Sequence, residues 1–369
     1  FGKYDGIDLE VDANAAGKSY ALAQGGTIAL TMNSKSVAYS KKGGYYGINA
    51  IEADASANAI SGAGYYYPYL NLANKVTLPG GDESAPADAI AIAGTVDISL
   101  DQAAAIAKEG GGIYADVSAY AKNKDDYGHT AFAQGGTATI SLTNGSAAKG
   151  GYYGAAIGAN ADAYADGKSG GMAEGGTISL GVTDSGVYGY TGINTTAYAS
   201  AYASKNGGVA EAMGGTITID LTNSFVNTKY TAVYANASAY AYGDTSAPAK
   251  GAYTLAQGGT VTVSLTGSTI RTDDVGGHGV HTQNNANAGG YGGSYAAYLG
   301  TVTVNLDSNS LILAYGAGSY GVFFGSTYGN GVAGADCDTS YNATCNTLNN
   351  QGTVYSAAST AVVGSDNGD

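Results

Sequence analysis

The chain has 369 residues, including 60 glycines and 32 tyrosines but only 4 prolines and no tryptophan, and just 12% of its residues are charged. This is not the composition of an average enzyme. Its 29 acidic and 15 basic residues give a net charge of -14, which repels phosphate backbones and argues against nucleic acid as a partner. No run of about 18 apolar residues occurs, so no transmembrane helix is expected.

A segment that begins with Gly-Thr and then alternates apolar and polar residues recurs along nearly the whole chain. Its copies start near residues 25, 93, 135, 175, 214, 258, 299 and 351, and their threonines are Thr27, Thr95, Thr137, Thr177, Thr216, Thr260, Thr301 and Thr353. Successive threonines are 68, 42, 40, 39, 44, 41 and 52 residues apart, so the central period is close to 40 residues. Alternation with a period of two predicts β-strands.

A second recurring element lies between these segments. It consists of a small residue, an aliphatic residue and then a ribbon of the form Ala-x-Ala-x, with copies from Gly6, Gly47, Gly112, Gly154, Gly192 and Ala232 and weaker copies from Gly279 and Gly321. Alternation sets the two faces of each strand. In 216–221 we predict that the inward residues are Ile217, Ile219 and Leu221 and the outward ones are Thr216, Thr218 and Asp220.

One such unit cannot bury its apolar side alone, so neighbouring units must stack. We therefore predict an all-β fold, a repetitive parallel β-solenoid or stacked β-arches, with a repeat of about 40 residues. Residues 1–369 form a single repeat array, in which 330–369 is a less regular C-terminal segment with a cysteine pair. Whether each repeat makes one rung or two stays open.

The pattern of GGTITIDLTNS followed by Gly-Ile and a small-residue ribbon resembles the passenger repeats of bacterial autotransporters. That resemblance implies a right-handed parallel β-helix. The richness in Gly, Ala and Tyr also resembles the amyloid-like sheath proteins of methanogenic archaea, which implies stacked β-arches that assemble around cells.

These features predict a structural subunit of an extracellular assembly, such as a sheath, wall or filament, whose main partner is another copy of the chain. The alternative is an adhesin or autotransporter passenger stalk at the cell surface, with carbohydrate as a possible partner. A polysaccharide-cleaving β-helix enzyme is a distant third. The sequence starts at Phe1, which fits a mature exported form and equally a fragment.

Two acidic clusters are candidate catalytic sites. The run from Asp273 and Asp274 to His278 resembles polygalacturonase motifs, but the family separates these motifs by about one coil and here they lie four residues apart. Asp125 and Asp126 near His129 also do not reproduce the spacing of these motifs. We assign no catalytic residue and no cofactor, and we expect the protein not to be an enzyme.

Metal sites are also not expected, with one weak candidate. His278 and His281 are three residues apart and should point to opposite sides of a strand, so we expect exposed turn histidines that do not share a metal. Asp8, Glu10 and Asp12 share a strand face and form a weak Ca²⁺ candidate. The competing interpretation is an edge strand that uses charge to prevent uncontrolled pairing.

Outward tyrosines recur at equivalent places and should form stripes that pack against protein or carbohydrate. They are Tyr120, Tyr164, Tyr198, Tyr202, Tyr240 and Tyr242. Thr-x-Thr pairs such as Thr216 and Thr218 raise the idea of an ice-binding ladder. The unequal repeat spacings predict that they form no regular lattice.

Cys337 and Cys345 are the only cysteines. They enclose a short loop, and outside the cell they can close it as a disulfide or cross-link neighbouring subunits. We expect them to be oxidised in one of these two ways.

Overall fold

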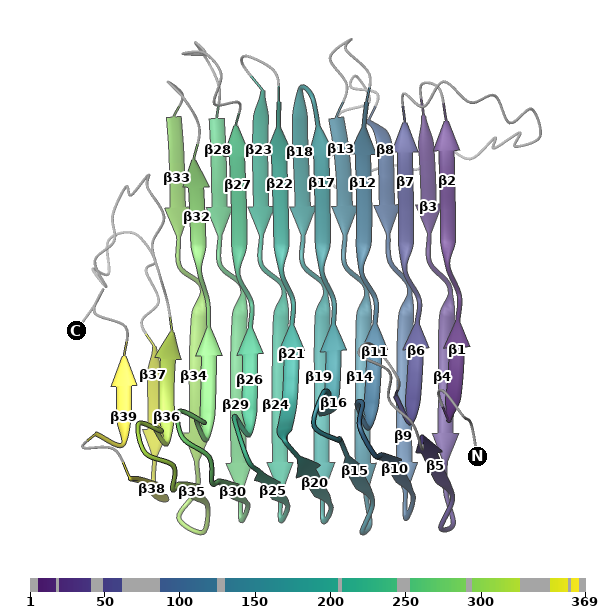
Figure 1. The fold of residues 1–369 in the computed structure, drawn as a ribbon. Coiled ribbons are helices and arrows are strands. Elements are labelled where there is room, and N and C mark those ends of the chain that lie inside the picture. The colour runs from purple at the N-terminus through teal and green to yellow at the C-terminus, as the bar shows by residue number, and fades with distance from the viewer. Residues whose placement is uncertain are drawn as a thin grey trace.

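The computed structural model describes residues 6–17, 20–40, 49–61, 87–124, 130–204, 208–243, 253–289, 294–325, 346–357 and 360–364. The regular structure in these residues consists entirely of β-strands, which stack into one continuous array (Figure 1). The predicted all-β solenoid is confirmed. The described segments include no helix that is long and apolar enough to cross a membrane.

The strands form five parallel sheets, which we number I to V in the order in which the chain visits them. Sheet I contains β1 (Ile7–Glu10), β6 (Ile51–Asp54), β11 (Ile113–Asp116), β16 (Ala155–Asn160), β21 (Thr191–Thr196), β26 (Val233–Asn236), β31 (Val280–Gln283), β36 (Val322–Gly325) and β39 (Val362–Gly364). Sheet II contains β2 (Ala13–Gly17), β7 (Ala57–Ser61), β12 (Ala119–Asn123), β17 (Ala163–Gly167), β22 (Ala199–Ala203), β27 (Ala239–Gly243) and β32 (Ala286–Gly289).

Sheets III and IV form the opposite side. Sheet III contains β3 (Ala21–Gln24), β8 (Ala87–Ile92), β13 (Thr130–Gln134), β18 (Gly170–Glu174), β23 (Val209–Met213), β28 (Tyr253–Gln257) and β33 (Ser294–Tyr298). Sheet IV contains β4 (Thr27–Met32), β9 (Thr95–Asp101), β14 (Thr137–Thr143), β19 (Thr177–Thr183), β24 (Thr216–Thr222), β29 (Thr260–Thr266), β34 (Thr301–Leu306) and β37 (Thr347–Asn350).

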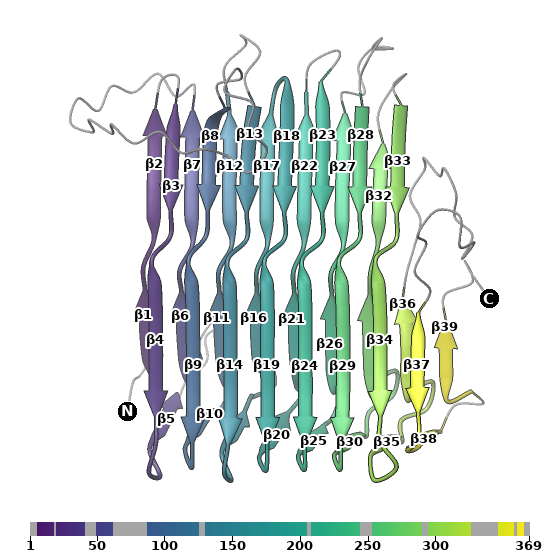
Figure 2. The same cartoon turned by 180° about the vertical axis from the view of Figure 1, so that it is seen from behind.

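Sheet V is short and closes the coil. It contains β5 (Val37–Ser40), β10 (Ala104–Ala107), β15 (Ala147–Lys149), β20 (Gly186–Gly189), β25 (Phe225–Thr228), β30 (Thr269–Thr272), β35 (Leu311–Ala314) and β38 (Thr353–Ser356). The chain ascends through sheets I and II on one broad face, descends through III and IV on the other, and returns through V (Figures 1 and 2).

Each repeat of about 40 residues therefore makes one rung, which settles the question that the sequence left open. Seven rungs contain a strand in all five sheets, and β36 to β39 continue sheets I, IV and V beyond them. At about 4.8 Å per strand, the stack is roughly 40 Å long.

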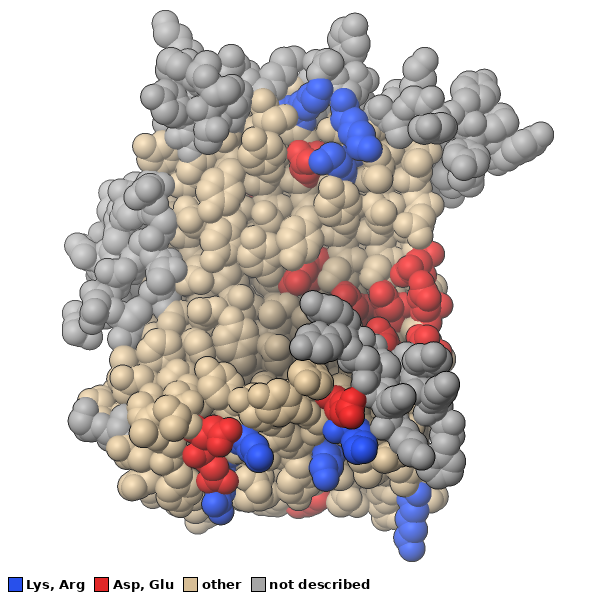
Figure 3. All heavy atoms as spheres, in the orientation of Figure 1, with Lys and Arg blue, Asp and Glu red and all other residues tan. Residues whose placement is uncertain are grey.

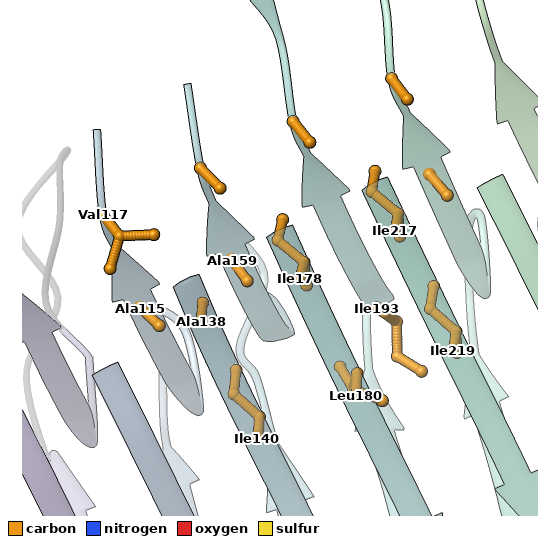
Figure 4. Close-up of a cluster of buried hydrophobic side chains, with 14 of the residues drawn as sticks. Ala115, Val117, Ala138, Ile140, Ala159, Ile178, Leu180, Ile193, Ile217 and Ile219 are labelled. Carbon is orange, nitrogen blue, oxygen red and sulfur yellow. The ribbon is translucent and has the colours of Figure 1, made fainter. Parts of the chain in front are cut away.

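The predicted inward and outward faces are confirmed at 216–221, where Ile217, Ile219 and Leu221 are fully buried. Between sheets I and IV the core consists mainly of Ile, Leu and Val side chains that repeat from rung to rung, together with alanines such as Ala115 and Ala159 (Figure 4). Between sheets II and III it consists almost entirely of alanine. The small alanine side chains let facing strands of II and III bring their Cα atoms within 8 Å, so this half of the solenoid is thin.

In seven of the eight Gly-Thr copies the glycine before the threonine lies in the bend from sheet III to sheet IV, and from the second rung on it lies directly over its equivalent in the preceding rung. The last copy differs from the expected equivalence, because Gly352 and Thr353 lead into β38 of sheet V. A Cβ atom on Gly215 would lie 2.0 Å from the carbonyl oxygen of Gly176, and one on Gly259 would lie 1.9 Å from that of Gly215. No side chain fits between these stacked backbones. The Gly-Thr signature therefore reports a close approach of successive rungs.

The turn from sheet IV to sheet V contains a buried ladder of serines. A residue with positive φ, such as Asp184 (49°) or Asn223 (49°), precedes the serine, and short polar side chains tolerate this conformation. The serine hydroxyl then accepts the backbone N–H of its equivalent in the preceding rung, as from Ser185 N to Ser224 Oγ (3.3 Å) and from Ser224 N to Ser268 Oγ (3.0 Å). The Asn-Ser and Asp-Ser pairs of the repeat thus satisfy buried backbone groups.

Substituting Gly215→Ala tests the close approach at the bend. We expect it to lower the free energy of unfolding by about 1–3 kcal/mol, the usual cost of forcing atoms into a packed site. Urea denaturation followed by circular dichroism measures this change.

Gly181→Ala is the matched control, because a Cβ atom at this strand position meets no atom within 4 Å. Replacing a strand glycine there should be neutral or stabilise the fold by roughly 0.5–1 kcal/mol. Equal destabilisation by the two variants would contradict the proposed role of the bend glycine.

Candidate functional site

The candidate functional groups lie on the two broad outer faces of the stack. Each face presents columns of side chains, one from each rung, because neighbouring strands pair in parallel and in register. We call the outer side of sheets I and II the front face and the outer side of sheets III and IV the back face.

The predicted tyrosine stripe lies on the front face in two adjacent columns of sheet II. Tyr120 pairs in register with Tyr164, and Tyr202 pairs with Tyr242 in the next column. Tyr240 continues the first column after an interruption at Ser200. Tyr198 lies in the bend from sheet I to sheet II. The tyrosines therefore form a stripe along the stack, and the stripe shifts from one column of sheet II to the adjacent column between the fourth and fifth rungs.

The rings of this stripe pack against one another. Tyr198 bridges Tyr164 and Tyr240, with centroid distances of 5.4 and 5.2 Å and interplanar angles of 41° and 36°. Tyr240 in turn stacks on Tyr242 at 6.5 Å. The ring faces are thus partly occupied by neighbouring tyrosines, and this stripe offers a ligand mainly ring edges and hydroxyl groups.

Amide groups of the next rung donate hydrogen bonds to two hydroxyl groups of the tyrosine stripe. Asn287 Nδ2 donates to the hydroxyl of Tyr242 (3.0 Å), and Asn285 Nδ2 donates to that of Tyr240 (3.3 Å). Burial raises the pKa of Tyr198 and Tyr242, so both hydroxyl groups stay protonated at neutral pH. A protonated hydroxyl offers both a donor and an acceptor to a partner.

Acidic side chains gather on the N-terminal part of the same face, where sheet I meets sheet II (Figure 3). Asp8 and Glu10 lie on β1 at the edge of sheet I, and Asp12 follows in the bend. This position suits charge that blocks an edge strand. Among the described residues, no group of three or more His, Cys, Asp or Glu side chains is arranged to hold a metal ion.

Three further aspartates, which are not among the residues predicted from the sequence, continue this acidic group into the stack. Asp54 and Asp116 pair in register on sheet I, and Asp162 lies in the bend of the next rung. The Ser118 backbone N–H donates to Asp116 Oδ1 (3.0 Å), and that of Tyr198 donates to Asp162 Oδ1 (2.9 Å). Their signal in the sequence is an acidic residue just before successive alanine ribbons.

Burial and stacking disfavour the charged form of these aspartates. Desolvation raises the pKa of Asp162 to about 6, and the nearby carboxylate of Asp116 contributes. Desolvation also raises the pKa of Asp54 and Asp116, each of which is further raised by a neighbouring aspartate. The group therefore stores electrostatic repulsion at neutral pH and takes up protons as the pH falls.

This acidic group predicts that the fold becomes more stable as the pH falls from 8 to 5.5. A carboxyl group whose pKa is higher in the folded state than in the unfolded chain stabilises the fold when protonated, and that stability is lost as the pH rises through the folded value near 6. After allowance for solvent screening we expect a gain of roughly 1 kcal/mol, seen as a higher melting temperature by circular dichroism.

Asp162→Asn should raise the melting temperature at pH 8 and flatten its pH dependence. Asn194→Ala changes an exposed residue of the same face and should keep the wild-type slope. A melting temperature that falls steadily between pH 8 and 5.5, or an unchanged slope in Asp162→Asn, would contradict the assignment.

Two of the candidate polygalacturonase-like residues, Asp273 and His278, make hydrogen bonds to other protein groups. Asp273 Oδ1 accepts a hydrogen bond from Arg271 Nε (2.9 Å), and the guanidinium group lies over the ring of Tyr315. His278 accepts the backbone N–H of Tyr320 at Nδ1 (3.2 Å). Within the described residues no hydrogen bond joins His278 to Asp273 or Asp274. Asp125, Asp126 and His129 lie outside the described residues.

The two histidines differ from the expectation of separate, exposed turn residues. Their ring centroids are 5.3 Å apart, and both rings are half-buried against Phe323. Burial lowers the pKa of His278 and, helped by its neighbour, lowers that of His281 to about 4. The bend before β31 places both rings on the outer face, which alternation along a straight strand does not anticipate. Both imidazoles are neutral at neutral pH and belong to an aromatic cluster.

The back face carries the threonines, and here the expectation of an irregular lattice was wrong. The first threonines of seven strands pair in one continuous column: Thr27, Thr95, Thr137, Thr177, Thr216, Thr260 and Thr301. The longest interval, between Thr27 and Thr95, includes the connection 62–86 between sheets II and III, which lies outside the described residues. Extra residues in such connections leave the register of sheet IV unchanged.

Cys337 and Cys345 also lie outside the described residues, so their predicted oxidation stays a prediction. The strands that follow them do belong to the array. β37, β38 and β39 pair with β34, β35 and β36.

Comparisons of the chain with protein-family models, curated proteins and solved structures find no match. The fold therefore defines the class, a five-sheet parallel β-solenoid with one rung per repeat.

Proposed function

We propose that the protein is a structural subunit of an extracellular cell-surface assembly, such as a sheath, wall or filament, and that its copies associate by β-strand stacking. One observation carries the proposal: five parallel sheets continue in register from rung to rung. Every rung offers the same backbone hydrogen bonds and the same core positions to the next. A rung of a second copy therefore extends the sheets in the way that the chain's own rungs do.

The two ends of the described stack differ in charge, which favours head-to-tail association. In the described residues β1 to β5 have strand partners on one side only, and this end carries Asp8, Glu10 and Asp12. The terminal strands at the other end, β32, β33, β37, β38 and β39, contain no charged residue. Two acidic ends repel each other, whereas an acidic end and these uncharged strands do not.

The front face supplies a surface for lateral contacts in the same assembly. Tyrosine side chains that are between 36% and 39% exposed, such as Tyr120 and Tyr242, combine apolar area with a polar tip. In a rod built from stacked copies, this stripe recurs with each subunit. Neighbouring rods then meet through repeated tyrosine and asparagine groups.

The second candidate is an adhesin or autotransporter passenger stalk, in which one array is displayed at the cell surface. The polar groups of the tyrosine stripe favour this candidate. A row of side chains on the front face contains the hydroxyl groups of Tyr240 and Tyr242 and the amide groups of Asn285 and Asn287. Such a row suits hydrogen bonding to the hydroxyl groups of a carbohydrate. The two candidates differ in whether the stack continues beyond one chain.

Concentrated purified protein should form long fibres that diffract with a strand repeat of 4.7–4.8 Å along the fibre axis, continuous through subunit junctions. Electron cryo-microscopy and fibre diffraction measure this repeat directly. Protein that stays monomeric at high concentration would contradict assembly by stacking and favour the adhesin stalk.

The charge at the acidic end provides a sharper test. Glu10→Gln should lower the protein concentration at which fibres appear, because it removes a charge that stacking has to desolvate. Asp220→Asn removes an exposed charge from the middle of sheet IV and should leave that concentration unchanged. Light scattering against concentration measures both effects, and equal shifts would argue against the acidic end as the junction.

A further inference from the structure

The back face carries a two-column array of hydroxyl groups that none of these roles uses. The array, which we call the hydroxyl lattice, lies on five successive strands, β14, β19, β24, β29 and β34. Its first column is Thr137, Thr177, Thr216, Thr260 and Thr301, and its second is Thr139, Ser179, Thr218, Thr262 and Thr303. Every position in this block of ten is a hydroxyl residue, and nine of the ten are threonines. Each of them is paired in register with a hydroxyl residue of the same column on an adjoining strand.

The spacing of the hydroxyl lattice is fixed by the backbone. Strands lie about 4.8 Å apart, and positions two residues apart on one strand are separated by roughly 6.6–6.8 Å. Backbone hydrogen bonds hold the first column at every junction, as from Thr216 N to Gly176 O (2.9 Å) and from Thr260 N to Gly215 O (2.9 Å). Threonine is also stiff about χ1 because its Cβ is branched. The strands that carry the lattice run straight and side by side (Figure 2).

The hydroxyl groups of the lattice are left to water. In the described part of the chain none of the ten makes a hydrogen bond to another protein group, and all ten residues are exposed or half-exposed. Each hydroxyl has one donor and two acceptors to satisfy. The nine threonines also contribute nine γ-methyl groups, which offer water no hydrogen bond. Such a face imposes its own spacing on the first water layer.

No charged residue lies within the hydroxyl lattice. The nearest charges on sheet IV are Asp220, one column further along β24, and Asp97 on the preceding strand. Charged groups hold water in strong, radially oriented shells. Because they are absent from the lattice, the spacing of the hydroxyl groups determines how the water over it is arranged.

We propose that the hydroxyl lattice binds ice. A prism face of hexagonal ice repeats its oxygen positions on a rectangular net with one short and one long spacing, which are similar in size to those of the lattice. A small sugar occupies only a few of the ten positions, whereas a crystal surface engages all of them at once. The ligand is thus a periodic surface of water, anchored by threonine hydroxyl groups and ordered over the methyl groups. This inference is separate from the assembly proposed above, because a single chain carries the whole lattice.

The test is to measure ice affinity with purified protein kept below the concentration at which it assembles. The chain should partition into a slowly growing ice hemisphere and show thermal hysteresis in a nanolitre osmometer, unlike serum albumin at the same concentration. Thr218→Lys places a long charged side chain at the centre of the lattice and should abolish both effects. Asn194→Lys adds the same charge to the front face of the same rung and should leave them unchanged.

Thr218→Val keeps the shape and the methyl group and removes one hydroxyl, so we expect a partial loss of hysteresis. Circular dichroism confirms that each variant is folded. A folded wild-type chain that the ice excludes would overturn the proposal, as would ice binding that survives in Thr218→Lys. Binding to crystalline cellulose or chitin without ice affinity would also overturn it and would assign the face to a polysaccharide surface.

Discussion

Parallel, in-register pairing between successive rungs is the constraint on which the rest of this structure depends. It places each side chain about 4.8 Å from its equivalent in the next rung. Any residue type that recurs at one position of the repeat is therefore stacked on itself along the axis. Stacking stabilises the fold where the repeated residue packs or hydrogen-bonds to its copy in the next rung, and it destabilises the fold where the repeated residues carry the same charge.

Several groups benefit from this arrangement. The glycines at the bend from sheet III to sheet IV bring successive backbones together where a Cβ atom has no room. The buried serines join each rung to the next through hydrogen bonds to the backbone, as Ser185 and Ser224 do. The alanines of sheets II and III let those sheets approach closely and make that half of the solenoid thin. Each of these is a small residue repeated at one place in the coil.

Stacking is unfavourable for charged groups, because like charges are brought close together. Asp54 and Asp116 lie one above the other, and the pKa of Asp54 is raised by burial and by the Asp116 carboxylate. Asn160, Thr196 and Asn236 occupy the next positions of this column, so the acidic run ends after the third rung. The front face is consequently acidic near the N-terminal end and rich in Tyr, Asn and His further along. On the back face, sheet IV carries a continuous column of threonines through seven rungs. The two faces of one solenoid thus offer different chemistry to different partners.

The sequence by itself determined the fold class, the length of the repeat and the inward face of each strand, because a period of two and a recurring Gly-Thr signature are local properties of the chain. It predicted that Ile217 and Ile219 are buried, and it located the outward tyrosines. Only the tertiary structure decided that one repeat makes one rung, which tyrosine rings touch, and that Asp116 and Asp162 approach each other. It also aligned Thr27 with Thr95 across an interval of 68 residues. The physical reason is that register is set by hydrogen bonds between rungs, and residues inserted in a connection outside the sheets change the spacing in the sequence without changing the spacing in space.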